Sequence, residues 1–543
     1  MQRLFKLSFH ISKRESWILL GLLFLIAVYL RLGPMVHREF WEDELFTISF
    51  ASKPYPVLFH LLHPLDDRPP LFYLFTKALL IFTRDEFWLR LPSFLASLSC
   101  IWLGFVMFAK KSRSLALIVA ALFTFSPFTI EYGWQLRDYG VLLPISLISM
   151  MVFAQIAERL WQNPDSRPYR LLIIFALLSL IGCSLNYIYV CFLLSFLFVG
   201  TIAVWWMGNR TQKILRSALY IWLFHLPVLT LSAQYIYQQR QMMMSTTTWI
   251  PQVSLQGIEG LLSAIGGLTF SLDEVYQLVN TWLWKESLVF LVVNLIGALW
   301  LYSQRKKVSK TWKFFTLVGI GTLMVNFLMI ISISFSVDRS LFLPRTFLPA
   351  VITYCVAFGI LMYSVFKALF RRPWLLVAAV LVGTTLWSAS YWKSYFSRYP
   401  SLVFDQRIDR FQKNRPLVDL IKSHLLPTQH IVFLPDHFQQ LFLTTYFPDH
   451  SMLSSRLAVA LQERAKGTSA PLPLRLGGPV QYIILIRSKN YFYQDLSYYS
   501  VEYFEYNQKI EKELMRLCGG NLNRVAETTD FFVDECLWNS YEN

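Results

Sequence analysis

The sequence predicts an α-helical protein that crosses a membrane many times and ends in a small α/β domain. Of its 543 residues, 55% are hydrophobic and only 15% are charged, whereas soluble domains carry about 25% charged residues. Apolar runs of spanning length recur between residues 17 and 392. From residue 393 the chain becomes polar and contains strand-like runs. The fold class is therefore a polytopic helical bundle of about 11 spans, with a soluble C-terminal domain.

The eleven candidate spans follow from the requirement for about 20 largely apolar residues, with a minimum near 17. They are 17–33, 87–109, 114–131, 139–157, 171–185, 187–207, 217–236, 286–303, 313–335, 342–366 and 373–392. The first follows a basic N-terminus but precedes no small-residue cleavage motif, so it is predicted to remain an uncleaved span. The run 71–82 is too short to span and follows two prolines, which predicts a position in the membrane interface.

Basic residues in the short connections predict the orientation, because cytoplasmic loops are enriched in Lys and Arg. Alternate connections carry the basic groups, which are Lys110 to Arg113, Arg210 to Arg216, Arg305 to Lys313 and Lys367 to Arg372. The opposite connections hold little beyond Arg137 and Arg339. A cytoplasmic N-terminus follows, with loops 34–86 and 237–285 and the segment 393–543 outside. The Asn-x-Thr sequon at Asn209 falls on the predicted cytoplasmic side, which favours the plasma membrane of a bacterium.

Two domains are predicted: a transmembrane module over 1–392 and an extracytoplasmic soluble domain over 393–543. In the second, His430–Leu434 and Gln481–Ile486 are typical of buried strands, and 406–425 and 503–517 of helices. It has no Gly-rich phosphate loop and no nucleophile elbow, so we interpret it as a lid or support domain. Cys518 and Cys536 both fall there, and the sequence leaves open whether they form a disulfide. The other four cysteines lie in apolar segments as expected for small buried hydrophobes.

The net charge of +16 does not indicate a nucleic-acid partner, because the basic residues form short runs between apolar segments rather than one basic face. No CxxC or His/Cys cluster indicates zinc. The partners expected from composition are therefore membrane lipids, and no cofactor is predicted.

An acidic motif follows the first span. Glu42, Asp43 and Glu44 lie between Phe40-Trp41 and Leu45. Charge runs are commonly solvated loops. Charges whose only role is to face water are, however, not expected between apolar residues on both sides. A carboxylate here would be able to accept a proton from a hydroxyl nucleophile, which is general-base chemistry.

Two further stretches carry arginines where positive charge is not expected. Arg137 lies in the run from Glu131 to Tyr139 on the predicted outer side, and a guanidinium matches phosphate or carboxylate. A local ion pair with Asp138 or Glu131 is the alternative. Arg345 lies just inside the span 342–366, where a charge is costly and indicates a functional site. Arginines and a carboxylate on one side of the membrane suit a donor with a lipid phosphate leaving group.

The order of these motifs resembles the GT-C superfamily of glycosyltransferases. The motifs are Trp-x-Asp-Glu after the first span, then Arg-Pro-Pro-Leu-Phe-Tyr, then Gln-Leu-Arg-x-Tyr, then Leu-Pro-Arg-Thr-Phe-Leu-Pro. The most similar branch is the bacterial relatives of dolichyl-phosphate-mannose protein mannosyltransferases, which include the lipid A aminoarabinose transferases. The resemblance covers roughly residues 15–390 in topology. It implies transfer of a sugar from a polyprenyl-phosphate donor to a lipid, glycan or protein acceptor on the extracytoplasmic face, usually with inversion.

The resemblance also implies roles for residues. Asp43 is the general base, with Glu44 beside it. The arginines Arg137, Arg345 and Arg68 bind the donor phosphate; Arg68 stands where relatives carry His or Lys before Pro-Pro. The remaining substrate-site candidates are Trp41, Gln135, Asp138 and Tyr139. Gln135 stands where many relatives carry Glu, so this position lacks their charge.

Three other hypotheses remain open at this stage. A transporter or flippase of lipid-linked sugars would also contain intramembrane charges, although they should line the midplane. An assembly protein with a partner-binding outer domain would leave the acidic motif incidental. Metal-dependent oligosaccharide transfer would need a second carboxylate near Asp43, and the sequence places none firmly, so no metal site is predicted.

Overall fold

The structure, a computed structural model, describes twelve stretches of the chain: 11–37, 40, 42–60, 69–208, 210–246, 309–336, 341, 343–369, 430–434, 480–488, 523–527 and 531–539, besides a few isolated residues. They divide into two compact units. The helical unit comprises Met1–His37, Pro56–Phe72 and Phe87–Arg407, and the sheet unit comprises Arg38–Tyr55, Tyr73–Glu86 and Ile408–Asn543.

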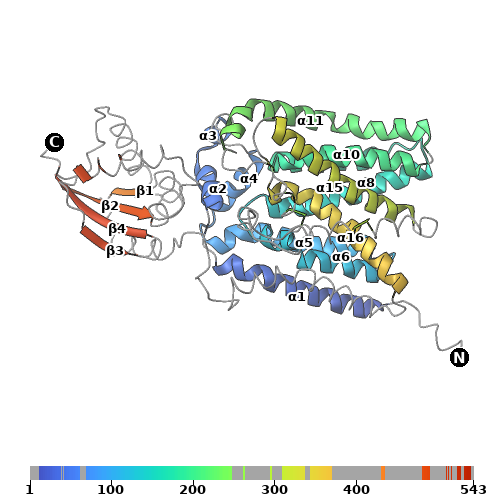
Figure 1. The fold of residues 1–543 in the computed structure, drawn as a ribbon, viewed down its shortest axis with the longest axis horizontal. Coiled ribbons are helices and arrows are strands. Elements are labelled where there is room, and N and C mark those ends of the chain that lie inside the picture. Colours follow the sequence, from blue (N-terminus) through green and yellow to red (C-terminus); the bar gives the residue numbers. More distant parts are fainter. Residues whose placement is uncertain are drawn as a thin grey trace. The chain divides into compact units, whose positions relative to one another are not determined.

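The helical unit is a bundle of long apolar helices (Figure 1). Its helices are α1 (Lys13–His37), α3 (Tyr55–His60), α5 (Glu86–Ala109), α6 (Arg113–Phe125), α7 (Pro127–Glu131), α8 (Tyr139–Gln162), α9 (Tyr169–Leu185), α10 (Ile188–Met207), α11 (Gln212–Thr246), α15 (Lys310–Ser336) and α16 (Leu348–Leu369), with a 3-10 turn η1 (Pro344–Phe347). Within the described residues, seven helices are long and apolar enough to cross a membrane. The chain is a multi-pass membrane protein.

These helices coincide with the predicted spans at most positions, because spanning length and hydropathy are read directly from the residues. The predicted span 217–236 is too short, since α11 continues to Thr246 through a Gln- and Met-rich stretch that favours helix. The predicted span 373–392 lies outside the described residues, and so does almost all of the predicted span 286–303.

The predicted span 114–131 is wrong as a single helix. It consists of α6 and α7, with extended backbone at Ser126 between them. Pro127 explains the break, because proline disfavours the helical conformation in the preceding residue and has no N–H to donate. As a result, the carbonyl of Phe123 loses the donor that a continuous helix would supply from position 127.

The hydroxyl of Thr129 replaces this donor at 2.7 Å, and Arg31 of α1 supplies a second one. Its side chain is fully buried and donates to the carbonyl of Phe123 at 2.8 Å and of Thr124 at 3.4 Å. It also donates to the carbonyl of Thr129 at 3.2 Å and to that residue's hydroxyl at 2.9 Å. The carbonyl of Ala27 in α1 accepts a further bond at 3.1 Å. One guanidinium therefore joins α1 to both sides of the α6–α7 break.

The spanning helices α8, α10 and α16 form the interior of the bundle, because they are its most deeply buried ones. α15 packs against α16 and α10, and α16 also packs against α6 and α8. An aromatic cluster joins α8, α9, α10 and α15 through Phe153, Phe175, Phe196 and Phe314, with ring centroids 5.3 to 6.1 Å apart in contacting pairs. Cys100, Cys183 and Cys355 are buried and Cys191 is half-buried, all as free thiols, which agrees with the expectation for these apolar segments.

The sheet unit contains α2 (Glu42–Ser52), the greater part of α4 (Leu71–Leu80) and four strands. The strands are β1 (His430–Leu434), β2 (Val480–Ser488), β3 (Asn523–Glu527) and β4 (Phe531–Asn539), in the order β1-β2-β4-β3. β1 and β2 are parallel, and β4 pairs antiparallel with β2 and β3 (Figure 1).

The two strands predicted in the C-terminal segment are confirmed as β1 and β2, while β3 and β4 were not predicted. The predicted helix 406–425 lies outside the described residues, as do Cys518 and most of 503–517. Cys536 lies in β4, opposite Ile483 of β2.

Candidate functional site

The segment from Glu131 to Tyr139 connects α7 to α8 through a series of bends. Gln135, Arg137, Asp138 and Tyr139 are all at most 2% exposed. Four residues of these types are rarely buried together on a connection, because an unpaired charge in an apolar interior is very costly. We call this segment, residues 131–139, the arginine turn.

Arg137 is anchored through its backbone. Its N–H donates to the carbonyl of Gln135 at 2.7 Å, and its carbonyl accepts a bond from the hydroxyl of Ser93 in α5 at 3.1 Å. Its guanidinium carbon lies 5.9 Å from the centroid of the Tyr139 ring, within range of a cation–π contact. Arg137 lies two residues before α8, whose helix dipole favours an anion at its N-terminus.

Gln135 offers a hydrogen-bond acceptor. Its side-chain NH₂ donates to the carbonyl of Glu131 at 3.0 Å, while its buried Oε1 accepts no hydrogen bond from the rest of the structure. Buried polar atoms usually have a partner. This oxygen is therefore suited to accept a hydrogen bond from a bound ligand.

Asp138 is held by a residue that sequence reasoning missed. The side-chain amide of Asn186, in the turn between α9 and α10, donates to its carboxylate at 2.5 Å. The Oδ1 of Asn186 accepts the N–H of Ile188 at 2.9 Å, which fixes the amide orientation. Asp138 precedes α8 but makes no capping bond to it. A short polar residue between two predicted spans was the only signal for Asn186.

Gly133 sets the distance between the arginine turn and α5. A Cβ atom at this position would lie 2.2 Å from the carbonyl oxygen of Thr129 and 2.6 Å from the hydroxyl of Ser97. Since backbone cannot move as freely as a flexible side chain, only glycine fits this approach.

Arg90 is a second buried arginine that sequence reasoning missed. It is fully buried in α5, and its guanidinium donates to the carbonyl of Met35 at the end of α1 at 3.1 Å. The same group lies 5.1 Å from the Trp134 ring centroid in the arginine turn. An arginine within the predicted span 87–109 was the available signal, since intramembrane charge indicates function or a specific partner.

Arg345 lies in η1, immediately before α16, and is half-buried. The turn is fixed by Thr346, whose N–H donates to the carbonyl of Leu343 at 3.0 Å and whose hydroxyl donates to that of Leu341 at 2.9 Å. The apolar segment Pro344–Val365 includes this arginine, as the sequence predicted.

Asp43 and Glu44 belong to the sheet unit, near the start of α2. Asp43 is half-buried, whereas Glu44 is fully buried. The carbonyl of Asp43 accepts the hydroxyl of Thr47 at 2.9 Å. Phe40 and Leu45 are buried on either side, which agrees with the apolar setting predicted for the motif. Trp41 and Arg68 lie outside the described residues.

Lys77 of α4 closes the other end of α2. Its ammonium donates to the carbonyls of Ala51 and Lys53 at 3.2 and 2.5 Å and lies 5.0 Å from the Tyr55 ring centroid. A cation at a helix C-terminus is favourable, and burial lowers the pKa of Lys77 below its ordinary value. This contact fixes the helix that carries Asp43.

Within the part of the chain that the structure describes, no group of three His, Cys, Asp or Glu residues is placed to hold a metal ion.

No family model matches the sequence, and no curated protein matches it. Solved structures do. ArnT from Cupriavidus metallidurans in the apo state aligns with a TM-score of 0.54 at 13% identity, over 96% of this chain and 98% of its own. The chain has the fold of ArnT. ArnT bound to undecaprenyl phosphate aligns with a TM-score of 0.53 at 11% identity over the same shares.

AglB, an archaeal oligosaccharyltransferase from Archaeoglobus fulgidus, aligns with a TM-score of 0.45 at 12% identity, over 87% of this chain and 69% of its own. The fold that the motif resemblance implied is therefore the fold that the chain shares with ArnT.

Gly133→Ala tests the packing of the arginine turn. We expect a loss of about 1–3 kcal/mol of stability, the usual cost of overpacking, and a loss of any activity that needs Arg137. Gly21→Ala in α1 is the matched control, because a Cβ there would have no neighbour within 4 Å and alanine is the better helix former. Melting in detergent measures both variants, and equal melting temperatures would contradict the close approach.

Proposed function

We propose that the protein is a glycosyltransferase that moves a sugar from a polyprenyl-phosphate donor to a lipid, glycan or protein acceptor on the extracytoplasmic face. The observation that carries the proposal is the buried arginine turn at the start of α8, in a chain whose fold is that of ArnT. A related ArnT structure contains undecaprenyl phosphate, which supports a lipid phosphate as the donor's leaving group.

In the proposed reaction, an acceptor hydroxyl attacks the anomeric carbon of the donor sugar, and the bond from that carbon to the phosphate oxygen breaks with inversion. Asp43 accepts the hydroxyl proton, and the polyprenyl phosphate leaves with the electron pair of the broken bond. Arg137, Arg345 and Arg68 stabilise the charge that develops on the phosphate. The N-terminus of α8 beside Arg137 adds to this stabilisation.

The different burial of the two carboxylates supports Asp43 rather than Glu44 as the base. Asp43 is half-buried and therefore able to meet an acceptor, whereas Glu44 is fully enclosed and suited to positioning. Trp41 and Tyr139 are proposed as aromatic walls of the substrate site. Gln135 is proposed as the acceptor of a substrate donor through its Oε1, and Asp138 as a residue that positions Arg137 while held by Asn186. The proposal includes no metal ion.

The proposed membrane arrangement is that of eleven spans, with a catalytic module over 1–392 and a soluble domain over 393–543. Seven described helices support the first part of this arrangement, and the basic connections support a cytoplasmic N-terminus in a bacterial plasma membrane. We expect a phosphatase reporter fused after Asn543 to be active, because that enzyme requires the extracytoplasmic side. Activity of a reporter that works only in the cytoplasm would refute the orientation.

Asp43→Asn is expected to lower turnover about 10²-fold or more, the usual range for the loss of a general base. The assay follows the release of polyprenyl phosphate from a radiolabelled polyprenyl-phosphate sugar in membranes that contain the protein. Asp85→Asn is the matched control, because it removes the same charge from an exposed residue of the sheet unit. Nearly wild-type turnover in Asp43→Asn would make this carboxylate structural. Donor that crosses the membrane unaltered would instead indicate a transporter, and activity lost in EDTA would indicate a metal-dependent transferase.

Arg137→Lys and Arg345→Lys are expected to lower kcat/KM for the donor about 10- to 100-fold each, because lysine keeps the charge but loses the bidentate hydrogen bonds. If both arginines bind one phosphate, the double variant should lose less than the product of the two single effects. Fully multiplicative losses would favour separate ion pairs with Asp138 and Asp338. Arg14→Lys, an exposed position in α1, is the control and should change nothing.

A further inference from the structure

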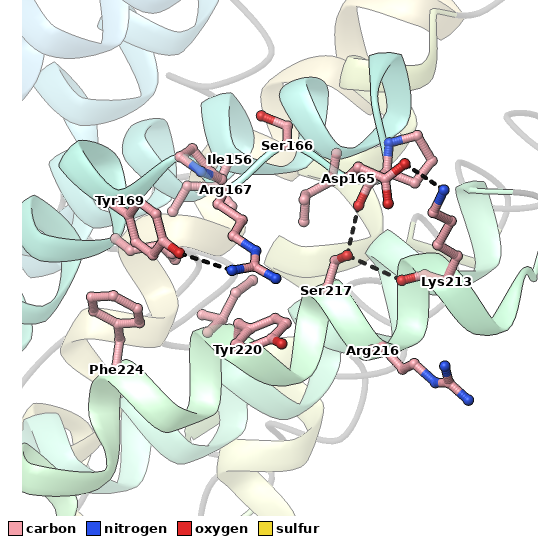
Figure 2. A pocket seen from close by; sticks show the side chains of 15 residues that line it. Ile156, Asp165, Ser166, Arg167, Tyr169, Lys213, Arg216, Ser217, Tyr220 and Phe224 are labelled. Carbon is pink, nitrogen blue, oxygen red and sulfur yellow. Dashed lines mark hydrogen bonds and ion pairs between the residues drawn. The ribbon is translucent and has the colours of Figure 1, made fainter.

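A second polar site lies at the opposite end of α8 from the arginine turn. It is a pocket of about 310 Å³ between the α8–α9 connection and the first turns of α11 (Figure 2). α8 contains 24 residues, so at about 1.5 Å per residue the two sites are about 36 Å apart. The pocket is therefore separate from the proposed transfer chemistry.

Its rim is basic. Arg167, Lys213 and Arg216 line it with a single acid, Asp165, which leaves an excess of two positive charges. Asp165 forms an ion pair with Lys213, so the two arginines are the cations that this acid does not already neutralise. α9 and α11 both begin at this end, at Tyr169 and Gln212. The positive ends of their helix dipoles therefore add to the positive charge of the rim.

Arg167 is already oriented for a ligand. Its guanidinium donates to the hydroxyl of Tyr169 at 3.3 Å and its central carbon lies 5.6 Å from the Tyr220 ring centroid. Figure 2 shows this guanidinium near the side chains of Tyr169 and Tyr220. An arginine whose rotamer is already restricted loses less entropy on binding.

The floor of the pocket is apolar. Ile156, Leu160, Leu172 and Ile221 are buried beneath the basic rim. The wall continues along α9 and α11 into apolar side chains that are exposed on the bundle surface, such as Ile173 at 50% and Leu223 at 58%. A basic rim above an apolar wall matches a molecule with an anionic head and a hydrocarbon tail rather than a soluble anion.

We propose that this pocket binds an anionic glycerophospholipid of the inner leaflet, with the phosphate at Arg167, the charge of Arg216 on the same rim adding to the attraction, and an acyl chain along α9 and α11. The assignment to the inner leaflet depends on the proposed orientation, whereas the choice of an anionic lipid depends only on the residues that line the pocket. Basic pockets between membrane helices on the cytoplasmic side are suited to such head groups, because the inner surface is rich in anionic lipid.

The test uses native mass spectrometry of the full-length protein in detergent, with phosphatidylglycerol or phosphatidylcholine added. We expect retention of phosphatidylglycerol in preference to phosphatidylcholine. Arg167→Gln with Arg216→Gln should weaken retention about 20-fold or more, since each arginine near a charged lipid contributes about fivefold. Arg14→Gln with Lys110→Gln is the matched control, because it removes two exposed charges at the same end of the bundle.

Asp165→Asn is a second variant with the opposite sign. It removes the only acid that lines the pocket and releases Lys213, so it should strengthen retention. Equal retention of the two lipids by the wild-type protein would overturn the proposal. So would a loss of retention in the control pair as large as that in the double arginine variant. Unchanged retention in both the Asp165→Asn variant and the double arginine variant would also overturn it. Full competition by inorganic phosphate at millimolar concentration would overturn it as well, because the site would then bind a soluble anion. None of these readouts depends on transferase activity.

Discussion

The candidate site in the helical bundle depends on one contact, in which the Arg31 guanidinium donates hydrogen bonds to the carbonyls at the α6–α7 break. Pro127 removes one backbone donor at this corner, and the Thr129 hydroxyl replaces it at the Phe123 carbonyl at 2.7 Å. Arg31 supplies further donors to Phe123, Thr124 and Thr129 while remaining fully buried itself. A buried charge without partners is very costly, so the carbonyls that the break leaves open are what allow Arg31 to be buried.

This corner positions the arginine turn. α7 ends at Glu131, whose carbonyl accepts the Gln135 amide, so the direction in which the chain leaves α7 determines where Arg137 lies. α5 then fixes the turn from the other side through the Ser93 bond and the close approach at Gly133. The proposed phosphate site is therefore built from rigid helix ends rather than from a free loop, which suits a group that must be ready before charge develops.

Much of the bundle could be predicted from the sequence because membrane spans are set by length and hydropathy alone. The acidic motif, Arg137 and Arg345 could be singled out because charge beside apolar residues is conspicuous. The α6–α7 break was missed because the segment 114–131 was judged by its mean hydropathy, which does not register the turn at Ser126, although Pro127 is a local signal for it. Arg31, Arg90 and Asn186 were missed for a different reason. Their importance comes from partners far away in the chain: Asn186 and Asp138, for example, are 48 positions apart, and no local pattern reports such a pairing.

The two proposed sites both suit a phosphate group, but they differ in how far they are enclosed. Each lies at one end of α8, where helix termini and arginines together favour phosphate. They differ in enclosure: the side chain of Arg137 is 1% exposed, whereas Arg167 and Arg216 are exposed. Enclosure strengthens an electrostatic contact and suits the stabilisation of a leaving group, while an open rim suits a lipid that exchanges with the bilayer.

The most direct measurement is an experimental structure of the protein with polyprenyl phosphate bound. We expect one phosphate to lie within hydrogen-bond distance of the guanidinium groups of both Arg137 and Arg345. Each N–H···O contact joins atoms only about 3 Å apart, so guanidinium groups more than about 15 Å apart could not share a phosphate. That separation, or a phosphate bound elsewhere in the bundle, would contradict the account.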